Sequence, residues 1–143
     1  MDCLTVIDLV RRLEEPPIRA LLALSVGFPT PAKIEAVCQL YRASVADHLL
    51  GCERDGVVIG CIGIELIGLT EAVIHHLSVE AAQRRVGIGR WLLEQVRVRW
   101  RLTGLRAETD QEAVDFYRKC GFRVERLEEQ YPGIQRFRCT LNV

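Results

Sequence analysis

The sequence predicts a mixed α/β fold, and three observations lead to this class. Apolar residues in the first third of the chain have helical spacing. The middle third has apolar runs that lack alternation and are bounded by turn residues, as in antiparallel strands covered on both faces. The last third reads strand, helix, strand, helix and two strands. With 143 residues, we expect a single domain over residues 1–143.

Helices are expected throughout the first third. The opening segment has apolar residues spaced for one helical face: Val6, Leu9, Val10 and Leu13. The pair Pro16-Pro17 ends that segment, since proline cannot continue a helix. A second helix is predicted from Pro17 to Gly27, and a third begins at Ala32.

The rest of the chain supplies the strands and two further helices. Strands are predicted over residues 48–53, 57–67, 70–79, 105–108, 122–127 and 134–141. Helices are predicted over residues 87–101 and 110–120. Thr109 and Glu112 have the spacing of a capping box at the start of the last helix. Gly121 is placed to end it with a left-handed residue.

Composition excludes several classes of function. Nineteen basic residues balance nineteen acidic ones, which argues against a protein held on nucleic acid by charge. No apolar run approaches the roughly 20 residues that span a bilayer, and the N-terminus lacks a signal-peptide pattern, so we expect a cytoplasmic protein. The six cysteines form no C-x-x-C pair and no histidine lies at metal-finger spacing, so no metal is expected.

The most informative segment is the glycine turn, residues 84–89, which joins a predicted strand directly to an amphipathic helix. Gly87 and Gly89 let backbone N–H groups converge without an intervening Cβ. With Arg84 and the helix N-terminus, they predict a site for a phosphate or pyrophosphate. No Gly-Lys-Ser/Thr follows, and Leu92 occupies the third glycine position of a dinucleotide fingerprint. An ordinary helix start is the alternative interpretation.

Two motifs resemble those of the GNAT superfamily of N-acetyltransferases. Residues 84–89, Arg-Arg-Val-Gly-Ile-Gly, match its Q/R-x-x-G-x-G/A signature. Residues 113–122, Ala-Val-Asp-Phe-Tyr-Arg-Lys-Cys-Gly-Phe, resemble its A-x-x-F/L-Y-x-x-x-G-F segment. The resemblance covers roughly residues 30–141. It implies a central mixed, mostly antiparallel sheet flanked by helices, with strands that splay apart at the cofactor site.

The resemblance implies acetyl-CoA as cosubstrate, because the signature turn of GNAT proteins holds its pyrophosphate through backbone amides. Carried over, the turn comprises Arg84, Arg85, Val86, Gly87, Ile88 and Gly89, with Arg90 nearby. Backbone groups of Leu77 and Val79 would hold the pantetheine arm. The Leu77 N–H would face the thioester oxygen, where amine attack leaves negative charge. Asp110 replaces a frequent asparagine that touches the CoA arm, and its charge disfavours cofactor binding.

The resemblance also implies two catalytic residues. Tyr117 matches the tyrosine that protonates the departing CoA thiolate, a role that requires the phenol to be held in contact. His75 falls where arylalkylamine-type members place a histidine, and an imidazole suits removal of the amine proton, directly or through water. Histone-type members place a glutamate where Val73 stands, so that base is missing. His76 is expected on the opposite face, since side chains alternate along a strand. A core tyrosine and a packed histidine are the alternatives.

The sequence therefore predicts an acetyl-CoA-dependent N-acetyltransferase that works by direct attack in a ternary complex. A non-catalytic acetyl-CoA-binding or regulatory module is the second hypothesis, and a binder of a different phosphate ligand is the third. The acceptor is expected to be a small-molecule amine or a peptide amine, and the sequence does not say which. A homodimer is common for such folds, and the sequence leaves the oligomeric state open.

Overall fold

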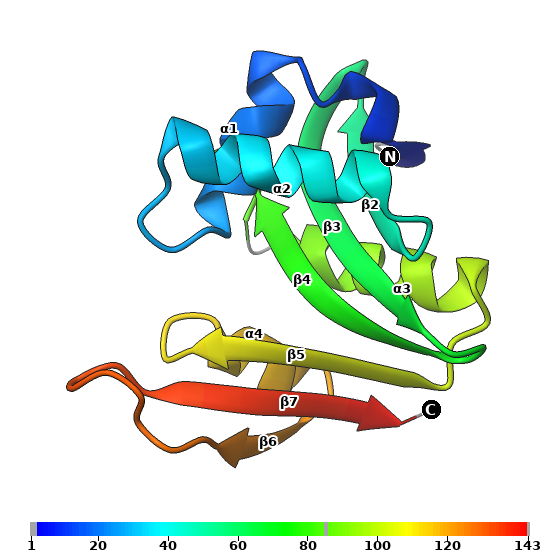
Figure 1. Ribbon diagram of the computed structural model, residues 1–143. Helices are drawn as coiled ribbons and strands as arrows, with labels where there is room; N and C mark the ends of the chain where they lie inside the picture. Colours follow the sequence, from blue (N-terminus) through cyan, green and yellow to red (C-terminus); the bar gives the residue numbers. More distant parts are fainter. Residues whose placement is uncertain (1–2, 85, 143) are drawn as a thin grey trace.

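The computed structural model describes residues 3–84 and 86–142, whose strands form one sheet in the order β1-β2-β3-β4-β5-β7-β6 (Figure 1). The strands are β1 (Thr5–Asp8), β2 (Asp47–Arg54), β3 (Val57–Ile67), β4 (Glu71–Val79), β5 (Gly104–Asp110), β6 (Arg123–Arg126) and β7 (Arg136–Asn142). Within the described residues β4 and β5 run parallel, and the other neighbouring strands are antiparallel. The expected mixed, mostly antiparallel sheet is confirmed.

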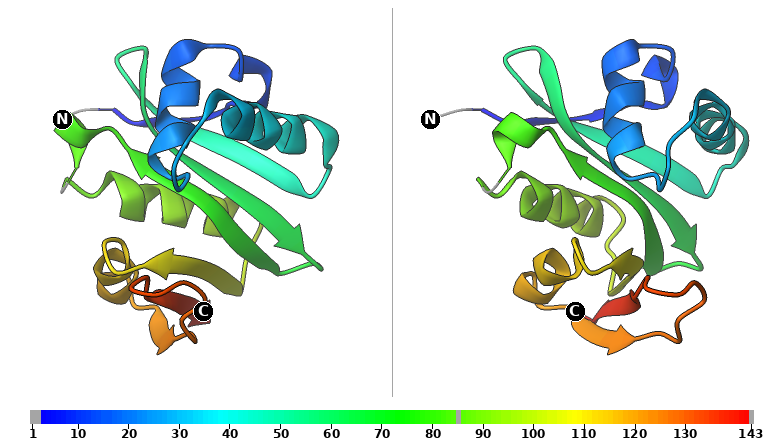
Figure 2. Two further views of the ribbon diagram at one scale, coloured as in Figure 1. Left: turned by 60° about the vertical axis from the view of Figure 1, so that its left-hand side comes forward. Right: turned by 90° about the vertical axis from the view of Figure 1, so that its left-hand side faces the viewer.

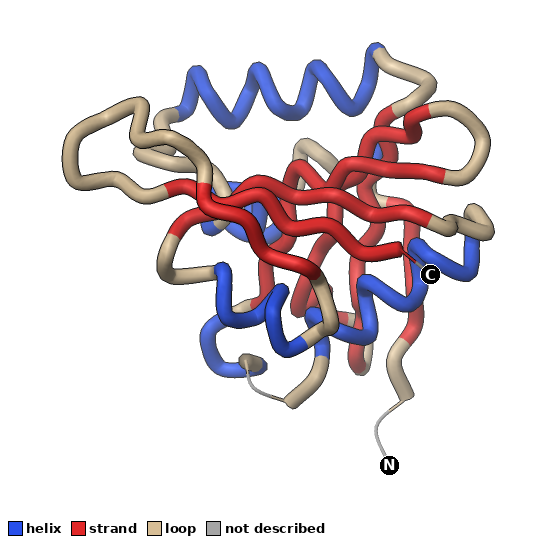
Figure 3. Tube along the Cα trace, turned by 90° about the horizontal axis from the view of Figure 1, so that it is seen from below, coloured by secondary structure: helices blue, strands red, loops and turns tan. Residues whose placement is uncertain are grey.

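Helices cover both faces of the sheet, and Figures 2 and 3 show the strands as a layer between them. The helices are α1 (Pro16–Leu24), α2 (Pro31–Ala43), α3 (Ile88–Arg99) and α4 (Val114–Lys119), with short 3-10 turns at Val10–Arg12 and Ala81–Gln83. We call the face that α1 and α2 cover the front face and the face that α3 and α4 cover the back face. Among residues 3–84 and 86–142, no helix crosses in front of β5 and β7, and we call this part of the front face open (Figure 1).

Each face has its own apolar core. The front core joins α1 and α2 to the sheet through residues that include Leu22, Tyr41, Leu49 and Cys61. The back core joins α3 and α4 to the sheet through residues that include Ile62, Leu92, Val96 and Tyr117. Adjacent residues of β3 such as Cys61 and Ile62 therefore pack into opposite cores, which is why the strand reads as a continuous apolar run.

The prediction of a helix over Val6 to Leu13 is wrong. Residues 5–8 form β1, which pairs with β2 at the edge of the sheet, and a 3-10 turn follows. The Val10 N–H donates to the Asp8 carboxylate at 2.8 Å, where the chain turns out of the strand. Leu9 and Leu13 are both buried in the front core, as helical spacing suggested, although the backbone between them is not an α-helix.

The last helix begins later than predicted, and the capping box is wrong. Asp110 ends β5, and its Oδ1 accepts hydrogen bonds from the N–H groups of Glu112 and Ala113 at 3.0 and 3.1 Å. This side-chain turn replaces a cap by Thr109, which is buried in the sheet instead. The predicted end is confirmed: Gly121 has φ of 91°, and the N–H of Phe122 donates to the Tyr117 carbonyl.

Candidate active site

Strands β4 and β5 separate part of the way along their length. Their pairing runs from Glu71 opposite Gly104 to Ile74 opposite Ala107. Beyond this point β4 continues to Val79 and β5 to Asp110, and the two strands diverge (Figure 1). Splayed strands, which the resemblance implied, are therefore present, and they leave the inner edge of each strand open.

The open edge of β4 presents backbone groups of Leu77 and Val79. The N–H of Glu80 donates to the Ile59 carbonyl across the antiparallel pair with β3 at 2.8 Å. Because backbone direction alternates along a strand, Leu77 and Val79 direct their N–H and C=O groups away from β3 and into the opening. The Val79 carbonyl accepts a hydrogen bond from Arg84 Nε at 3.0 Å. The role of both residues in holding an extended ligand stays a prediction.

The glycine turn lies between the end of β4 and the start of α3. Gly87 has φ of 88°, a left-handed conformation that glycine adopts without strain, and a Cβ added there would meet nothing within 4 Å. α3 begins at Ile88, so the first N–H groups of the helix have no partner within it and lie at the positive end of the helix dipole. Such a helix start can bind an anion, and that role of the turn stays a prediction. Arg85, a predicted member of the site, lies outside the described residues.

Three other predicted cofactor residues have defined positions around this turn. Val86 is exposed beside Gly87. Arg90 is exposed, and its Nη2 donates to the Lys119 carbonyl at 2.8 Å, which ties the start of α3 to the end of α4. Asp110, half-buried at the end of β5, directs one carboxylate oxygen to the backbone of the following turn. Arg90 and Asp110 thus have structural roles whether or not they also contact a ligand.

Tyr117 lies on α4 within the back core and is 6% exposed. Its ring packs edge-on against Phe116 and Phe122, each with a centroid distance of 5.2 Å. Burial raises the pKa of the Tyr117 phenol, with smaller contributions from Cys139 and Cys120, so the phenol is protonated at neutral pH. Leu77 packs against the same core, so Tyr117 and the open edge of β4 share the back side of the splayed strands.

His75 and His76 lie on the front face, so the prediction that they face opposite ways is wrong. Ile74 pairs with Ile64, and His76 pairs with Gly63, the residue just before Ile64. His75 therefore has no pairing partner on β3 and is an extra residue in β4. Such a bulge interrupts the alternation of side chains. His75 Nε2 lies 2.8 Å from Glu65 Oε1, and His76 Nδ1 lies 2.5 Å from the Tyr41 hydroxyl.

His76 is neutral at physiological pH. Its pKa is lowered to about 4, mainly by burial and in smaller part by the neighbouring imidazole of His75, while Asp47 partly opposes the change. Burial also raises the pKa of the Tyr41 phenol, so the bond between them joins two neutral groups. A Cβ on Gly63 would lie 1.7 Å from the Tyr41 oxygen, so this position requires glycine for the contact to form. The pair lies directly beside the β4 bulge, since His76 follows the extra residue His75.

Sequence reasoning missed two carboxylates beside His75. Asp47 on β2 pairs with Glu65 on β3, and ligand atoms of Asp47, Glu65 and His75 lie within 4.8 Å of one another. This composition can hold a cation. The signal in the sequence was a charged residue, Glu65, inside an otherwise apolar strand that is covered on both faces. Its partners, Asp47 and His75, come from two other strands and could not be read from local spacing.

Predicted site residues thus lie on both faces of the sheet beside the splayed strands. Tyr117, the glycine turn and the side chain of Leu77 lie toward the back face, and His75 lies on the front face at the first residue beyond the β4–β5 pairing. An extended ligand in the opening would be accessible from both. Within the described residues, none of the helices has the length and apolar character needed to cross a lipid bilayer.

Comparisons with known proteins agree with this geometry. The family model for an acetyltransferase (GNAT) domain matches residues 46–124. The chain is 33% identical to N-alpha-acetyltransferase RimI of Mycobacterium tuberculosis (strain ATCC 25618 / H37Rv) over 95 residues. That match covers 62% of this chain and 60% of the relative, so it spans less than two thirds of either protein.

Solved structures share the fold at lower identity. The ribosomal-protein-S18-alanine N-acetyltransferase from Escherichia coli superposes with a TM-score of 0.73 at 17% identity, covering 99% of this chain and 94% of that one. A GNAT family acetyltransferase from Elizabethkingia anophelis with acetyl-CoA bound gives a TM-score of 0.68 at 19% identity, covering 98% of both chains. At these identities the likeness concerns the fold.

Proposed function

The chain belongs to the GNAT acetyltransferase family, and on that premise we propose that it transfers an acetyl group from acetyl-CoA to a primary amine. The observation that carries the proposal is that two side chains able to transfer protons lie beside the splayed strands, on opposite faces of the sheet. A histidine lies on the front face and a buried tyrosine on the back face. We extend the proposal to one catalytic domain over residues 1–143, since the sheet is continuous from β1 to β6.

The described residues fit acetyl-CoA as the cosubstrate. The left-handed Gly87 and the unpaired amides that start α3 form an open cradle for a pyrophosphate. Leu77 and Val79 lie on β4, and their backbone groups point to the edge of β4 that is not paired with β3. There they can bind the amide-rich pantetheine arm. The relative from Elizabethkingia anophelis, whose fold this chain shares, has acetyl-CoA bound. Bound acetyl-CoA would supply the activated acetyl group.

The chain's own residues would stabilise one developing negative charge and transfer two protons. The Leu77 N–H donates to the thioester oxygen as negative charge develops there. His75, directly or through a water molecule, removes a proton from the amine on the front face. As the carbon–nitrogen bond forms and the carbon–sulfur bond breaks, Tyr117 gives its proton to the departing thiolate on the back face. Burial keeps Tyr117 protonated and ready to act as the acid, and it equally disfavours the tyrosinate left behind, so Tyr117 must regain a proton before the next turnover.

A second candidate, a non-catalytic acetyl-CoA-binding module, is favoured by one residue. Val73 is apolar at the position where histone-type members carry a glutamate base, and it is half-buried on β4. In our proposal the imidazole of His75, held by Glu65, replaces that carboxylate. The two candidates differ in whether free CoA thiol is released when an amine is added.

The replacement Tyr117→Phe tests the acetyl-transfer proposal. It removes only the hydroxyl, which makes no hydrogen bond to any described residue, so we expect an intact fold and unchanged acetyl-CoA affinity. General acid catalysis contributes roughly 100-fold or more, so turnover measured as thiol release should fall by that factor. Tyr131→Phe, in the exposed turn between β6 and β7, is the matched control and should keep full turnover.

Two results would count against the proposal. Unchanged turnover in Tyr117→Phe would remove Tyr117 from the mechanism. Acetyl-CoA binding with no thiol release from any amine in a broad panel would favour the binding module.

The replacement His75→Gln tests the proposed base. It should lower turnover most below neutral pH and less at high pH, where amines lose their proton without help.

A further inference from the structure

The front face carries a row of side chains, most of them charged, that crosses the sheet from β2 to β5. Registers place Asp47 opposite Glu65, Glu65 opposite Val73, and Val73 opposite Arg106. Residues opposite each other in neighbouring strands direct their side chains to the same face. The row therefore starts with two carboxylates, passes over one apolar residue and reaches a guanidinium.

The acidic end of the row contains a carboxylate without a partner. Asp47 is 7% exposed and, among the described residues, its carboxylate accepts no hydrogen bond and forms no ion pair. A carboxylate on a largely buried side chain favours a positive charge beside it. Its oxygen lies within 4.8 Å of ligand atoms of Glu65 and His75, so all three groups converge on one point. That point is where a positive charge would be stabilised.

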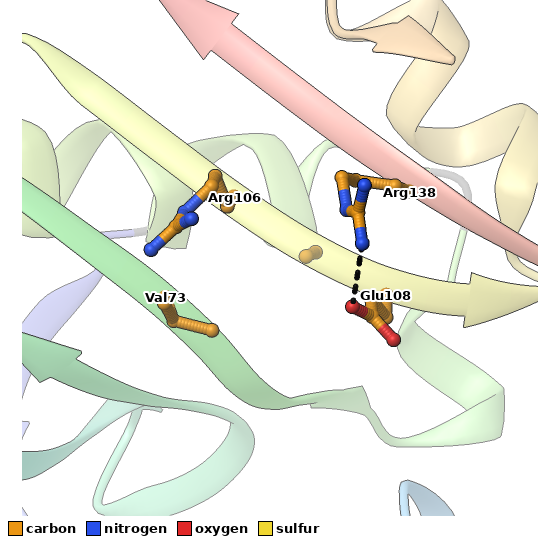
Figure 4. Close-up of a pocket in the computed structure, with 5 residues that line it drawn as sticks. Val73, Arg106, Glu108 and Arg138 are labelled. Atoms are coloured by element: carbon orange, nitrogen blue, oxygen red, sulfur yellow. Dashed lines mark ion pairs between the residues drawn. The ribbon is translucent and has the colours of Figure 1, made fainter. Parts of the chain in front are cut away.

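The basic end of the row contains a guanidinium without a partner. Arg106 forms no ion pair with any described residue, whereas Arg138 in the same depression lies 3.7 Å from Glu108 and 3.9 Å from Glu125. Arg106 extends over β4 beside Val73, away from the Arg138–Glu108 pair (Figure 4). The depression has a volume of about 300 Å³, which is enough for a small molecule. Arg106 is thus free to bind an anion there.

We infer that this row binds the acceptor as a zwitterion, with its ammonium group at Asp47, Glu65 and His75 and its carboxylate at Arg106. Neighbouring strands lie about 4.8 Å apart, so the backbones of Glu65 and Arg106 are about 10 Å apart, and their side chains narrow that gap. A short amino acid fits this span. A polyamine, in contrast, would place a second positive charge against Arg106. The inference rests on the proposed function, because it names the amine that His75 would deprotonate.

The test compares ω-amino acids of increasing length with their primary amides, at saturating acetyl-CoA and with thiol release as readout. Each pair has the same amine and nearly the same size, so only the carboxylate charge differs. We expect kcat/KM at least about tenfold higher for the acid than for the amide at the best length. Arg106→Gln should abolish this preference while leaving the amides unaffected. Arg123→Gln is the control, since Arg123 lies outside the row, two strands beyond Arg106, and the variant should keep the preference.

The outcomes separate this inference from the proposed function. Thermal stabilisation by acetyl-CoA, measured for each variant, shows that the variant folds and binds the cosubstrate. If amines are acetylated without preference for the acids, or if Arg106→Gln retains the preference, the zwitterion inference is wrong and the acetyltransferase proposal stands. If acetyl-CoA binds and only cations without a carboxylate are acetylated, the inference is equally wrong. If acetyl-CoA does not bind, both fail.

Discussion

The buried pair of Tyr41 and His76 predicts a dependence of stability on pH that can be calculated. Groups from three elements surround the imidazole: Tyr41 on α2, Asp47 on β2 and His75 on the same strand. Burial lowers the pKa of His76 from an ordinary value of 6.5 to about 4. Between these values the unfolded chain binds a proton that the native chain does not, so stability falls as pH falls from about 7 toward 4.

The expected size follows from the two pKa values. One pKa unit corresponds to 1.36 kcal/mol, so the full difference is roughly 3 kcal/mol, of which roughly 2 kcal/mol is lost between pH 7 and pH 5. Urea unfolding of the wild type and of His76→Gln at these two pH values measures it. The wild type should lose roughly 2 kcal/mol more than the variant, because glutamine does not titrate. His48→Gln, which alters a histidine packed against Trp100, is the control and should behave as the wild type does.

Equal losses in the wild type and in His76→Gln would refute this reasoning. Such a result would mean that His76 is protonated in the native protein at pH 5. The hydrogen bond to Tyr41 would then join a charged imidazole to the hydroxyl rather than two neutral groups.

Three further predictions concern packing and reactivity. Gly63→Ala should destabilise the fold by at least about 1–3 kcal/mol in urea unfolding, because the new Cβ would lie 1.7 Å from the Tyr41 oxygen; a neutral effect would contradict the contact. Gly121→Ala should cost about 1–2 kcal/mol by the same assay, because φ is 91° at the end of α4, and an unchanged midpoint would contradict the left-handed cap. A thiol reagent should label exposed Cys3 in the native protein long before Cys61, since burial raises the pKa of Cys61 to about 12; equal rates by mass spectrometry would contradict its burial.

The parts of the fold that local signals define were predictable from the sequence. The strand over residues 57–67 matches β3 residue for residue, because an apolar run follows a tight turn in which Asp55 and Gly56 both have positive φ. The glycine turn and the end of α4 at Gly121 were also visible, since each depends on a backbone conformation that glycine favours.

The parts that depend on distant partners were not predictable. β1 is a strand because β2, some forty residues later, offers it an edge, and nothing in residues 5–8 reveals that partner. The bulge at His75 arises from pairing with β3, so alternation along β4 alone gave the wrong face for His76. The row from Asp47 to Arg106 needs the registers of β2 through β5 and could not be assembled from sequence spacing.

The most direct test of the account is a thermal-shift titration with acetyl-CoA, with CoA and ATP alongside. A ligand at a hundredfold its Kd adds ~2.7 kcal/mol of stability, which for a chain of this size raises Tm by roughly 5–10 °C. The account predicts this rise with acetyl-CoA and with CoA, and none with ATP. Absence of a shift at millimolar acetyl-CoA would mean that the glycine turn and the splayed strands do not bind the cosubstrate, and the proposed acetyl transfer would be contradicted.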